Sequence, residues 1–313
     1  MLATMTRKVL DYREVRSIRR HRTRMERRMA EPYTAYWEQA RRTFPGAPPL
    51  EPDIARAVRE FTQQGLTSFW TPENNRLAES MFQTLRALEQ PHSELWRPQP
   101  EYNCFNLTTD VYRTFEEVER LFQGSLGQFL NGVFQSYFKI FYGTLFRSEH
   151  LTDKPTGSQL WHDDGGPGTC INVLFYLKDV TVDDGAWAGL PWASCFEIYR
   201  KALPVVRQRL RIRQRQEGGL SRNDQRQVRC AFYEEEISRG YADRILQPVG
   251  RAGMIVPFRN NIIHRGGYPK PGHTRYVCIF HCYPSHKPTP YERYRSVGML
   301  KTAGLPKDPA GDF

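Results

Sequence analysis

The chain has 313 residues, of which 39% are hydrophobic and 13% aromatic, and this composition indicates a globular protein with a sizeable buried core. No apolar run approaches the roughly 18 residues of a membrane-spanning helix, so the composition argues against a membrane span and an apolar signal core. The six cysteines form no CxxC pair and no dense framework. We therefore expect reduced thiols and a cytoplasmic protein.

The formal net charge of +11 is concentrated in two segments. Residues 1–30 carry a net charge of +7 and residues 200–229 carry +8, so the rest of the chain has a net charge of −4. Basic segments can bind nucleic acid, anionic lipid or acidic partners, but most of them are solvated helix faces, which is the interpretation we favour here. The acidic residues Asp11, Glu14 and Glu26 disfavour a mitochondrial transit peptide at the arginine-rich N-terminus.

The first part of the chain predicts helices. A helical but mostly polar pattern extends over residues 12–42, and a proline-rich link follows at 45–52. Ile54, Val58 and Phe61 then recur at helical spacing. Further helices are expected over 72–89, 116–122 and 126–134.

The second part of the chain predicts strands, interrupted by a basic helical insert. The segments with strand character are 136–146, 159–162, 170–177, 253–258, 261–264 and 274–284, and Asp183-Asp184-Gly185 supplies a turn. The insert covers about 198–245. Its helical face of Leu203, Val206 and Leu210 is expected just after a turn near Pro204, and Gly218-Gly219 should break the helix.

This order of elements predicts an α+β fold. Helices followed by many short strands, without regular βαβ alternation, fit a double-stranded β-helix or jelly roll faced by N-terminal helices, although periodicity alone leaves other α+β folds open. We expect a basic helical extension over 1–50, one main domain over 51–290 that contains the insert, and a C-terminal tail over 291–313.

The motif Trp161-His162-Asp163-Asp164 carries the first chemical signal. On a strand end, side chains at positions i and i+2 point to the same face, so His162 and Asp164 can hold one ion while Asp163 turns away. His264 follows the apolar pair Ile262-Ile263 and supplies a second imidazole. Two imidazoles and one carboxylate on one face of Fe(II) leave positions for a bidentate oxo-acid and for O₂.

Arg275 carries the second signal, eleven residues after His264. Its planar guanidinium is always charged and can grip both oxygens of a carboxylate, which suits the distal carboxylate of a 2-oxo diacid.

In their order and spacing, these residues and the Asp184-Gly185 turn resemble the phytanoyl-CoA dioxygenase family of Fe(II)/2-oxoglutarate oxygenases. Residues 61–65 followed by 71–74 look like that family's N-terminal strand running into its first helix, and the resemblance extends over roughly 56–284. It implies a cupin-like jelly roll with the metal site in the barrel mouth. It also implies Fe(II) on His162, Asp164 and His264, 2-oxoglutarate on Arg275, and O₂ as cosubstrate.

Two positions bear on how far this resemblance extends. Many relatives carry a hydroxyl residue two positions after the distal histidine, where this chain has Gly266, so a second donor for the cosubstrate must come from elsewhere or be absent. Related halogenases replace the carboxylate ligand by a small residue. Because this chain keeps Asp164, hydroxylation or another oxidation is favoured over halogenation.

The function expected from the sequence is the oxidation of an unactivated C–H bond in a small molecule or natural product. Trp187 and Trp192 are candidate substrate contacts, although aromatic core packing explains them equally well, and Arg259 is a candidate contact for an anionic or carrier-linked substrate. The alternatives are a non-catalytic jelly-roll binding protein and a nucleic-acid-associated protein that uses the basic segments. Binding to nucleic acid is disfavoured, and neither the substrate nor the oligomeric state follows from the sequence.

A zinc site is a further alternative, formed by Cys278, His281, Cys282 and His286. It is disfavoured because Cys278 and Cys282 would share one face of a strand while His281 points to the other.

Overall fold

The computed structural model describes residues 35–89, 94–164, 169–217 and 221–296. The helix predicted over 12–42 falls within this part only from residue 35, and residues 35–43 are indeed helical. The basic segment 1–30 and most of the C-terminal tail lie outside the described residues. Within the described part, no helix combines the length and the apolar character that crossing a bilayer requires.

Helices precede most of the strands, as the sequence predicts. The helices before the barrel strands are α2 (Pro52–Gln64), α3 (Pro72–Glu89), α4 (Val111–Thr114), α5 (Glu116–Gln123) and α6 (Ser125–Phe134). The strands are β1 (Trp96–Gln99), β2 (Cys104–Leu107), β3 (Tyr137–Glu149), β4 (Ile171–Tyr176), β5 (Ala188–Gly189), β6 (Ile255–Arg259), β7 (His264–Arg265) and β8 (Thr274–Ser285). Short 3₁₀ helices occupy Pro100–Tyr102, Gly157–Gln159 and Ala242–Arg244.

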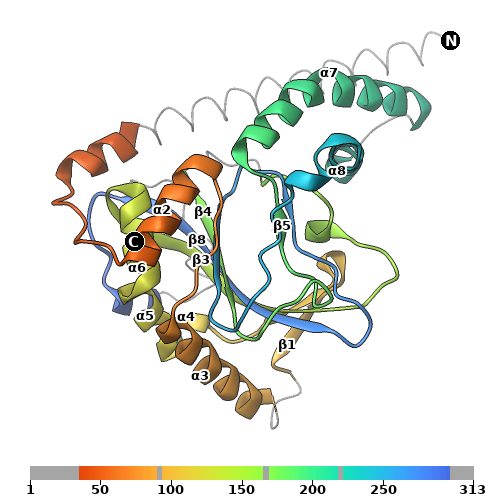
Figure 1. The fold of residues 1–313 in the computed structure, drawn as a ribbon. Coiled ribbons are helices and arrows are strands. Elements are labelled where there is room, and N and C mark those ends of the chain that lie inside the picture. The colour runs from red at the N-terminus through yellow and green to blue at the C-terminus, as the bar shows by residue number, and fades with distance from the viewer. Residues whose placement is uncertain (1–34, 90–93, 165–168, 218–220, 297–313) are drawn as a thin grey trace.

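Two antiparallel sheets form the core of the fold. The larger sheet has six strands in the order β1-β2-β3-β8-β4-β6, and β5 pairs with β7 in a second, two-stranded sheet. Isolated bridges extend the second sheet, among them His162–His264 and Gly189–Leu246. Figure 1 shows β4, β8 and β3 on one side of the fold and β5 facing them on the other. The fold is thus the predicted α+β double-stranded β-helix.

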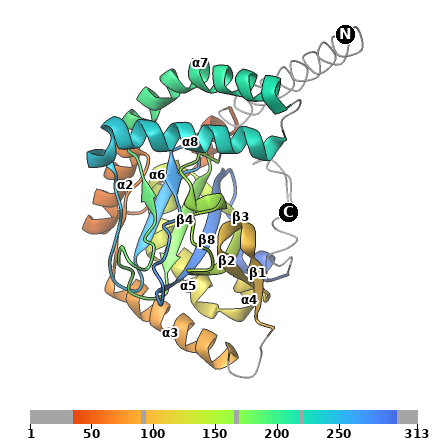
Figure 2. The same ribbon diagram turned by 90° about the vertical axis from the view of Figure 1, so that its right-hand side faces the viewer.

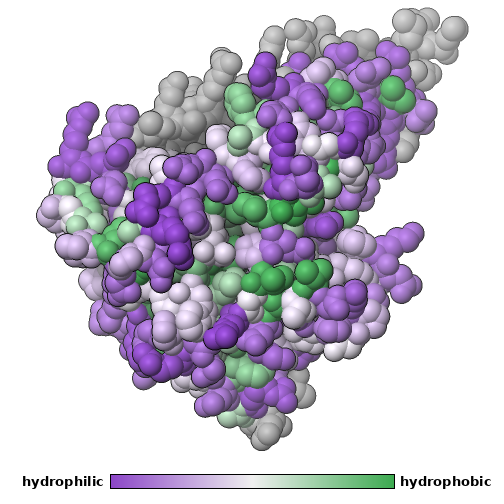
Figure 3. Space-filling model, viewed as in Figure 1, coloured by the Kyte–Doolittle hydropathy of each residue, from purple (hydrophilic) through white to green (hydrophobic). Residues whose placement is uncertain are grey.

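The strands β4, β6 and β8 of the larger sheet are mostly buried on both faces. Side chains alternate between the two faces along each strand. On β8, Cys278 and Phe280 belong to an apolar cluster that also contains residues of α2, α3, α5 and α6. Val277 and Ile279 point the other way, into a second cluster that includes Trp187 and residues of the insert. On the face of the molecule seen in Figure 3, apolar residues gather in the middle and polar residues surround them.

The basic insert forms two long helices, α7 (Trp192–Glu217) and α8 (Arg222–Gly240). They lie side by side outside the barrel (Figure 2). Ion pairs join them, including Arg209–Glu235 at 2.6 Å and Lys201–Glu236 at 3.2 Å. The insert begins six residues before the predicted start, at Trp192 rather than near 198.

Two local predictions were wrong. The turn expected near Pro204 is absent, because α7 continues through this residue. Pro204 and Arg200, whose carbonyl loses its helical partner, are both exposed, so this carbonyl can bond to water. Residues 61–64 are the end of helix α2 rather than an N-terminal strand; Gly65, with φ of 77°, ends the helix, and only Leu66 and Phe69 then bridge to β6.

All six cysteines lie in the described part of the chain, and they are buried thiols without disulfide bonds.

Candidate metal centre

The backbone brings the two histidine segments together. His162 N donates to His264 O at 2.9 Å, and His264 N donates to His162 O at 2.8 Å. Asp164 N donates to Asn260 O at 3.0 Å. Residues about one hundred positions apart in the sequence are therefore held in one antiparallel register, and their side chains leave from neighbouring points.

His162, Asp164 and His264 form a compact group. One potential ligand atom from each lies within 4.8 Å of the others, and among the described residues no other group of three or more His, Cys, Asp or Glu side chains is placed to hold an ion. The carboxylate of Asp164 lies between the imidazoles, with Oδ1 3.6 Å from His162 Nε2 and Oδ2 3.7 Å from His264 Nε2. The sequence-predicted triad thus comes together in space.

The imidazole rings are oriented by backbone carbonyls. His162 Nδ1 lies 2.7 Å from Leu160 O, and His264 Nδ1 lies 3.0 Å from Ile262 O. Because a carbonyl accepts a hydrogen bond, each Nδ1 donates, and Nε2 is the ring nitrogen that faces Asp164. A second hydrogen bond of this kind commonly fixes the tautomer of a metal-binding histidine.

The electrostatics of the group favour the protonation states that bind a cation. Burial, followed by the nearby His264, lowers the pKa of His162 to about 4. For Asp164, burial is the largest influence and raises the pKa. The nearby imidazoles of His264 and His162 act in the opposite direction and lower it, so that with the other favourable contacts the pKa lies below its ordinary value. Near pH 7 the group therefore holds a neutral His162 and an ionised Asp164.

Asn172 is a contact of the triad that the sequence analysis missed. Its Nδ2 donates to Asp164 Oδ2 at 2.8 Å and so restricts the rotation of the carboxylate. Asn172 lies on β4, where all six residues are buried. A single amide within this apolar run is the signal that could have identified it.

Asp163 points away from the triad, as alternation along a strand predicts. Its Oδ2 accepts a hydrogen bond from Tyr233 Oη at 2.7 Å and lies 3.7 Å from Arg229 Nη1. Both partners come from α8. Burial is also the main cause that raises the pKa of Tyr233, so its hydroxyl remains protonated and able to donate.

Arg275 lies at the start of β8 and is buried, with 6% of its surface exposed. Nη1 donates to the carbonyl of Gly185 in the predicted turn, and Nη2 lies 3.5 Å from Ser148 Oγ. Its Nε is buried and bonds to none of the described residues. Burial lowers the pKa of this guanidinium. A buried cation without a carboxylate in contact is costly unless it binds an anion.

Gly266 lies two residues after His264 in the sequence and is close to Arg275 in space. A Cβ built on Gly266 would lie 3.6 Å from Arg275 Nη2 and 3.9 Å from Ser158 Oγ. Gly266 N also donates to Ser158 O at 2.7 Å. Ser158, which the sequence analysis did not single out, thus presents a hydroxyl beside the position where a side chain at 266 would begin.

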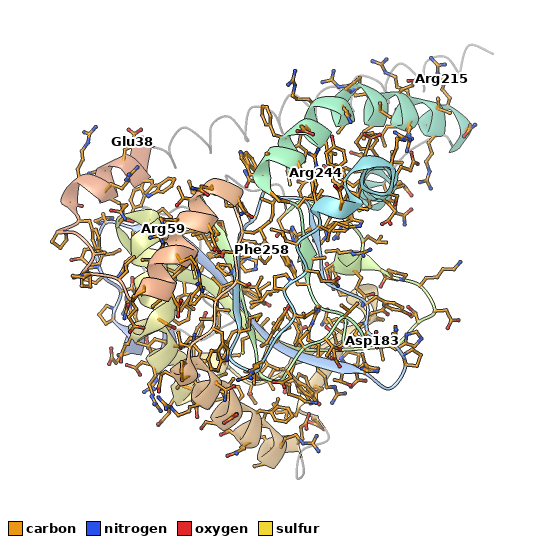
Figure 4. All side chains as sticks on the ribbon, viewed as in Figure 1. Glu38, Arg59, Asp183, Arg215, Arg244 and Phe258 are labelled. Atoms are coloured by element: carbon orange, nitrogen blue, oxygen red, sulfur yellow. The ribbon has the colours of Figure 1, made fainter. Side chains whose placement is uncertain are left out.

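The two tryptophans predicted as substrate contacts occupy different places. The Trp187 ring lies 4.6 Å from that of Phe258 and 6.0 Å from that of His264, measured between centroids. Phe258 lies in the central region between α2 and β5 (Figure 4). Trp192 begins α7, where its Cβ would lie 3.5 Å from a Cβ on Gly65. Only Trp187 therefore lies against a triad residue by a measured contact.

Arg259 lies at the end of β6, and its guanidinium carbon is 5.4 Å from the centroid of the Phe61 ring. Its Cδ would lie 3.6 Å from a Cβ on Gly65, so it is close to Trp192. Burial lowers the pKa of Arg259. These contacts place Arg259 with Trp192 in one neighbourhood and leave its role as a substrate contact a prediction.

The zinc alternative is not supported. Cys278 and Cys282 are fully buried in the apolar cluster on the helix side of the sheet. His281 packs against Tyr142 with ring centroids 5.3 Å apart, and His286 Nδ1 lies 2.6 Å from Tyr36 Oη. These four side chains point to different neighbours and do not converge.

No protein-family model matches the chain, and no curated protein matches it. Among solved structures, it is similar to the epimerase SnoN in complex with Fe³⁺, α-ketoglutarate and nogalamycin RO. Identity is 14% and the TM-score 0.47, over 83% of this chain and 92% of SnoN. It is also similar to EctD from S. alaskensis with 2-oxoglutarate and 5-hydroxyectoine. There, identity is 13% and the TM-score 0.47, over 79% of this chain and 89% of EctD. The carbocyclase SnoK from nogalamycin biosynthesis aligns at 13% identity and a TM-score of 0.49, over 73% of this chain and 83% of SnoK.

Proposed function

We propose that the protein is an Fe(II)/2-oxoglutarate-dependent dioxygenase that oxidises an unactivated C–H bond of a small molecule or natural product. The observation that carries this proposal is the convergence of His162, Asp164 and His264 within 4.8 Å. The buried guanidinium of Arg275 supports it, because its Nε lacks a partner among the described residues.

The donor set fits Fe(II). Two imidazole nitrogens and one carboxylate oxygen on one side of an ion match the facial arrangement of non-haem iron oxygenases. The protonated Nδ1 atoms leave Nε2 of His162 and His264 as the donors. Asn172 holds the carboxylate of Asp164 through Oδ2.

The surroundings of Arg275 fit 2-oxoglutarate. A dicarboxylate chelates a metal through one end and needs a cation for the other, and a planar guanidinium binds a carboxylate through two parallel hydrogen bonds. Arg275 is buried. It lies close to Gly266, which follows His264 by two residues, because a Cβ on Gly266 would be 3.6 Å from Arg275 Nη2. Its contacts with Gly185 O and Ser148 hold the guanidinium in place.

When bound together, Fe(II), 2-oxoglutarate and O₂ supply the oxidising power for breaking the C–H bond, with succinate and CO₂ as coproducts. The protein's own residues bind and orient these groups and the substrate, and they exclude water from the site. Trp187 and Phe258 provide apolar surface next to His264, and Asp164 keeps the carboxylate whose loss would favour halogenation.

The finer expectations are part of the same proposal. They are a relationship to the phytanoyl-CoA dioxygenase family, a cytoplasmic location, and a substrate that is anionic or carrier-linked and contacts Trp187, Trp192 or Arg259. We also keep the division into an extension over 1–50, a domain over 51–290 and a tail over 291–313.

The proposal is tested by anaerobic titration of the protein with Fe(II) and 2-oxoglutarate. We expect a weak visible charge-transfer band that His264→Ala abolishes. The matched control is His286→Ala, which removes a surface histidine bonded to Tyr36 and should keep the band. A wild-type protein without the band at saturating metal would overturn the assignment.

Catalysis is separated from mere binding by a second measurement. A catalytic protein releases succinate when a pool of metabolites is added with O₂, whereas a jelly-roll binding protein would bind 2-oxoglutarate and release none. Mass spectrometry of the pool would identify the oxidised substrate at the same time.

A further inference from the structure

The inserted helices contact both segments that carry the triad. From α8, Tyr233 Oη donates to Asp163 Oδ2 at 2.7 Å, between the ligand positions His162 and Asp164. From α7, Tyr199 Oη donates to Asn261 O at 2.7 Å, three residues before His264. The two hydroxyls thus reach the two chain segments that pair through the His162–His264 bridge.

A third contact adds to the hold on the second segment. Cys195 Sγ of α7 accepts a hydrogen bond from the backbone N–H of Ile263 at 3.1 Å, directly before His264. Cys195 is fully buried and Tyr233 is 2% exposed. Buried hydrogen bonds of this kind restrain their partners more than solvated ones do, because no water competes for the donors.

The contacting residues form one connected unit. The rings of Tyr199 and Tyr233 pack edge to face with centroids 6.2 Å apart. Arg229 lies 3.7 Å from the carboxylate of Asp163 and balances its charge. The Arg209–Glu235 pair joins the two helices further from the site. A shift of either helix would therefore be transmitted to both ligand segments.

We propose that Tyr233 and Tyr199 are positioning residues for the metal ligands, and that the α7–α8 insert is thereby a structural part of the metal centre. Tyr233 fixes the segment that carries His162 and Asp164 through the side chain between them. Tyr199 fixes the chain segment that leads to His264, through the carbonyl of Asn261. This inference rests on the proposed function in one respect, that the triad binds a divalent metal.

The test uses Co(II) alone as the probe, because its visible absorption reports coordination geometry without O₂ or turnover. The variants are Tyr233→Phe and Tyr199→Phe, each of which removes one hydroxyl and keeps the ring. The matched control is Tyr241→Phe. Tyr241 is buried at the same helix pair, and its hydroxyl donates to Glu197 of α7 at 3.0 Å, away from the ligand segments.

We expect Tyr233→Phe to bind Co(II) about 10-fold more weakly than the wild type. This is the low end of the roughly 10- to 100-fold cost of losing a direct partner of a ligand, because Tyr233 holds the residue between two ligand positions and not a ligand itself. Its Co(II) absorption should also change in position or intensity. Tyr199→Phe should show the same change to a smaller degree. Tyr241→Phe should match the wild type in both affinity and spectrum.

The outcomes separate this inference from the proposed function. Equal affinity and identical spectra for wild type, Tyr233→Phe and Tyr199→Phe would overturn the inference and leave the proposed function intact. A wild type that binds Co(II) no better than His264→Ala would overturn the proposed function, and the inference with it. Thermal unfolding without metal checks folding; should one variant fail to fold, the other decides.

Discussion

The two faces of the six-stranded sheet serve different purposes, and the middle of β8 shows the contrast. Cys278 and Phe280 point toward the N-terminal helices and are fully buried among apolar side chains. On the opposite face, Arg275 and His281 accompany Val277 along the same strand. His281 is close enough to Asp164 to lower its pKa.

The comparison separates two kinds of buried side chain: apolar ones that stabilise the fold, and a charged one that is better explained by a role in the site. Apolar surface removed from water contributes roughly 25 cal/mol per Å², so the helix-side face supplies stability. A buried guanidinium contributes no such gain, since its desolvation is offset only by its hydrogen bonds. The barrel-side face also packs Val277 and Ile279 in an apolar cluster, and it is less stabilising only where it buries the charged Arg275.

The largest expected effect is on the helix side. Phe129 of α6 is fully buried, and its ring lies 5.4 Å from that of Phe61 and 5.2 Å from that of Phe69. Phe129→Ala should reduce the free energy of unfolding by about 3–5 kcal/mol, because it leaves a cavity that rigid neighbours cannot fill. Urea unfolding measures this loss.

The same variant should leave Co(II) affinity unchanged at temperatures where it stays folded. A parallel loss of metal affinity in the folded protein would show that the two faces are not independent.

A substitution on the barrel side should weaken ligand binding and leave the stability of the fold unchanged or higher. Arg275→Met removes the guanidinium and keeps most of the side-chain volume. It should weaken 2-oxoglutarate binding by about 2–4 kcal/mol, since truncating one partner of a buried charge pair costs roughly this much or more. The free energy of unfolding without ligand should stay the same or rise, because a buried charge is removed.

Isothermal titration of Co(II)-loaded protein with 2-oxoglutarate measures the binding. Arg275→Lys is the control for charge: it keeps the cation and loses the fork, so we expect intermediate affinity. Unweakened binding in Arg275→Met would remove Arg275 from the cosubstrate site.

The sequence predicted the elements whose pattern is local. The strands β3, β4 and β8 are long and apolar enough to be recognised, and their observed bounds agree with the predicted ranges to within about three residues. The edge strand β1 and its neighbour β2 were missed. Both have only four residues, and Trp96–Gln99 is also largely exposed and contains a proline. The end of the helix at 61–64 was predicted as a strand from the family resemblance. The helical spacing of Ile54, Val58 and Phe61 indicated the correct structure.

The site divides in the same way. His162 and Asp164 share one motif, and His264 and Arg275 follow at a recognisable spacing, so these four could be named as candidates from the sequence. The structure brings His162, Asp164 and His264 together, and the role of Arg275 stays a prediction. Tyr233 was beyond reach, because it lies 70 residues from Asp163 and the contact depends on how α8 packs. Ser158 was missed for a related reason. It lies on the 3₁₀ helix Gly157–Gln159, and Gly266 directly follows β7, so their proximity depends on the fold and leaves no periodic pattern in the sequence.

Ser158 gives the smallest effect. If its hydroxyl supplies the donor that Gly266 lacks, Ser158→Ala should weaken 2-oxoglutarate binding by about 1 kcal/mol, the usual net contribution of one hydrogen bond. Gly266→Ser in the Ser158→Ala background should restore the affinity. A Cβ at 266 meets its nearest neighbour, Ser158 O, at 3.5 Å, which is ordinary contact, so the new side chain fits. Titration calorimetry on the Co(II)-loaded single and double variants measures both steps. Restoration would place the cosubstrate's distal carboxylate between residue 266 and Arg275, whereas a double variant as weak as Ser158→Ala would confine its anchoring to Arg275.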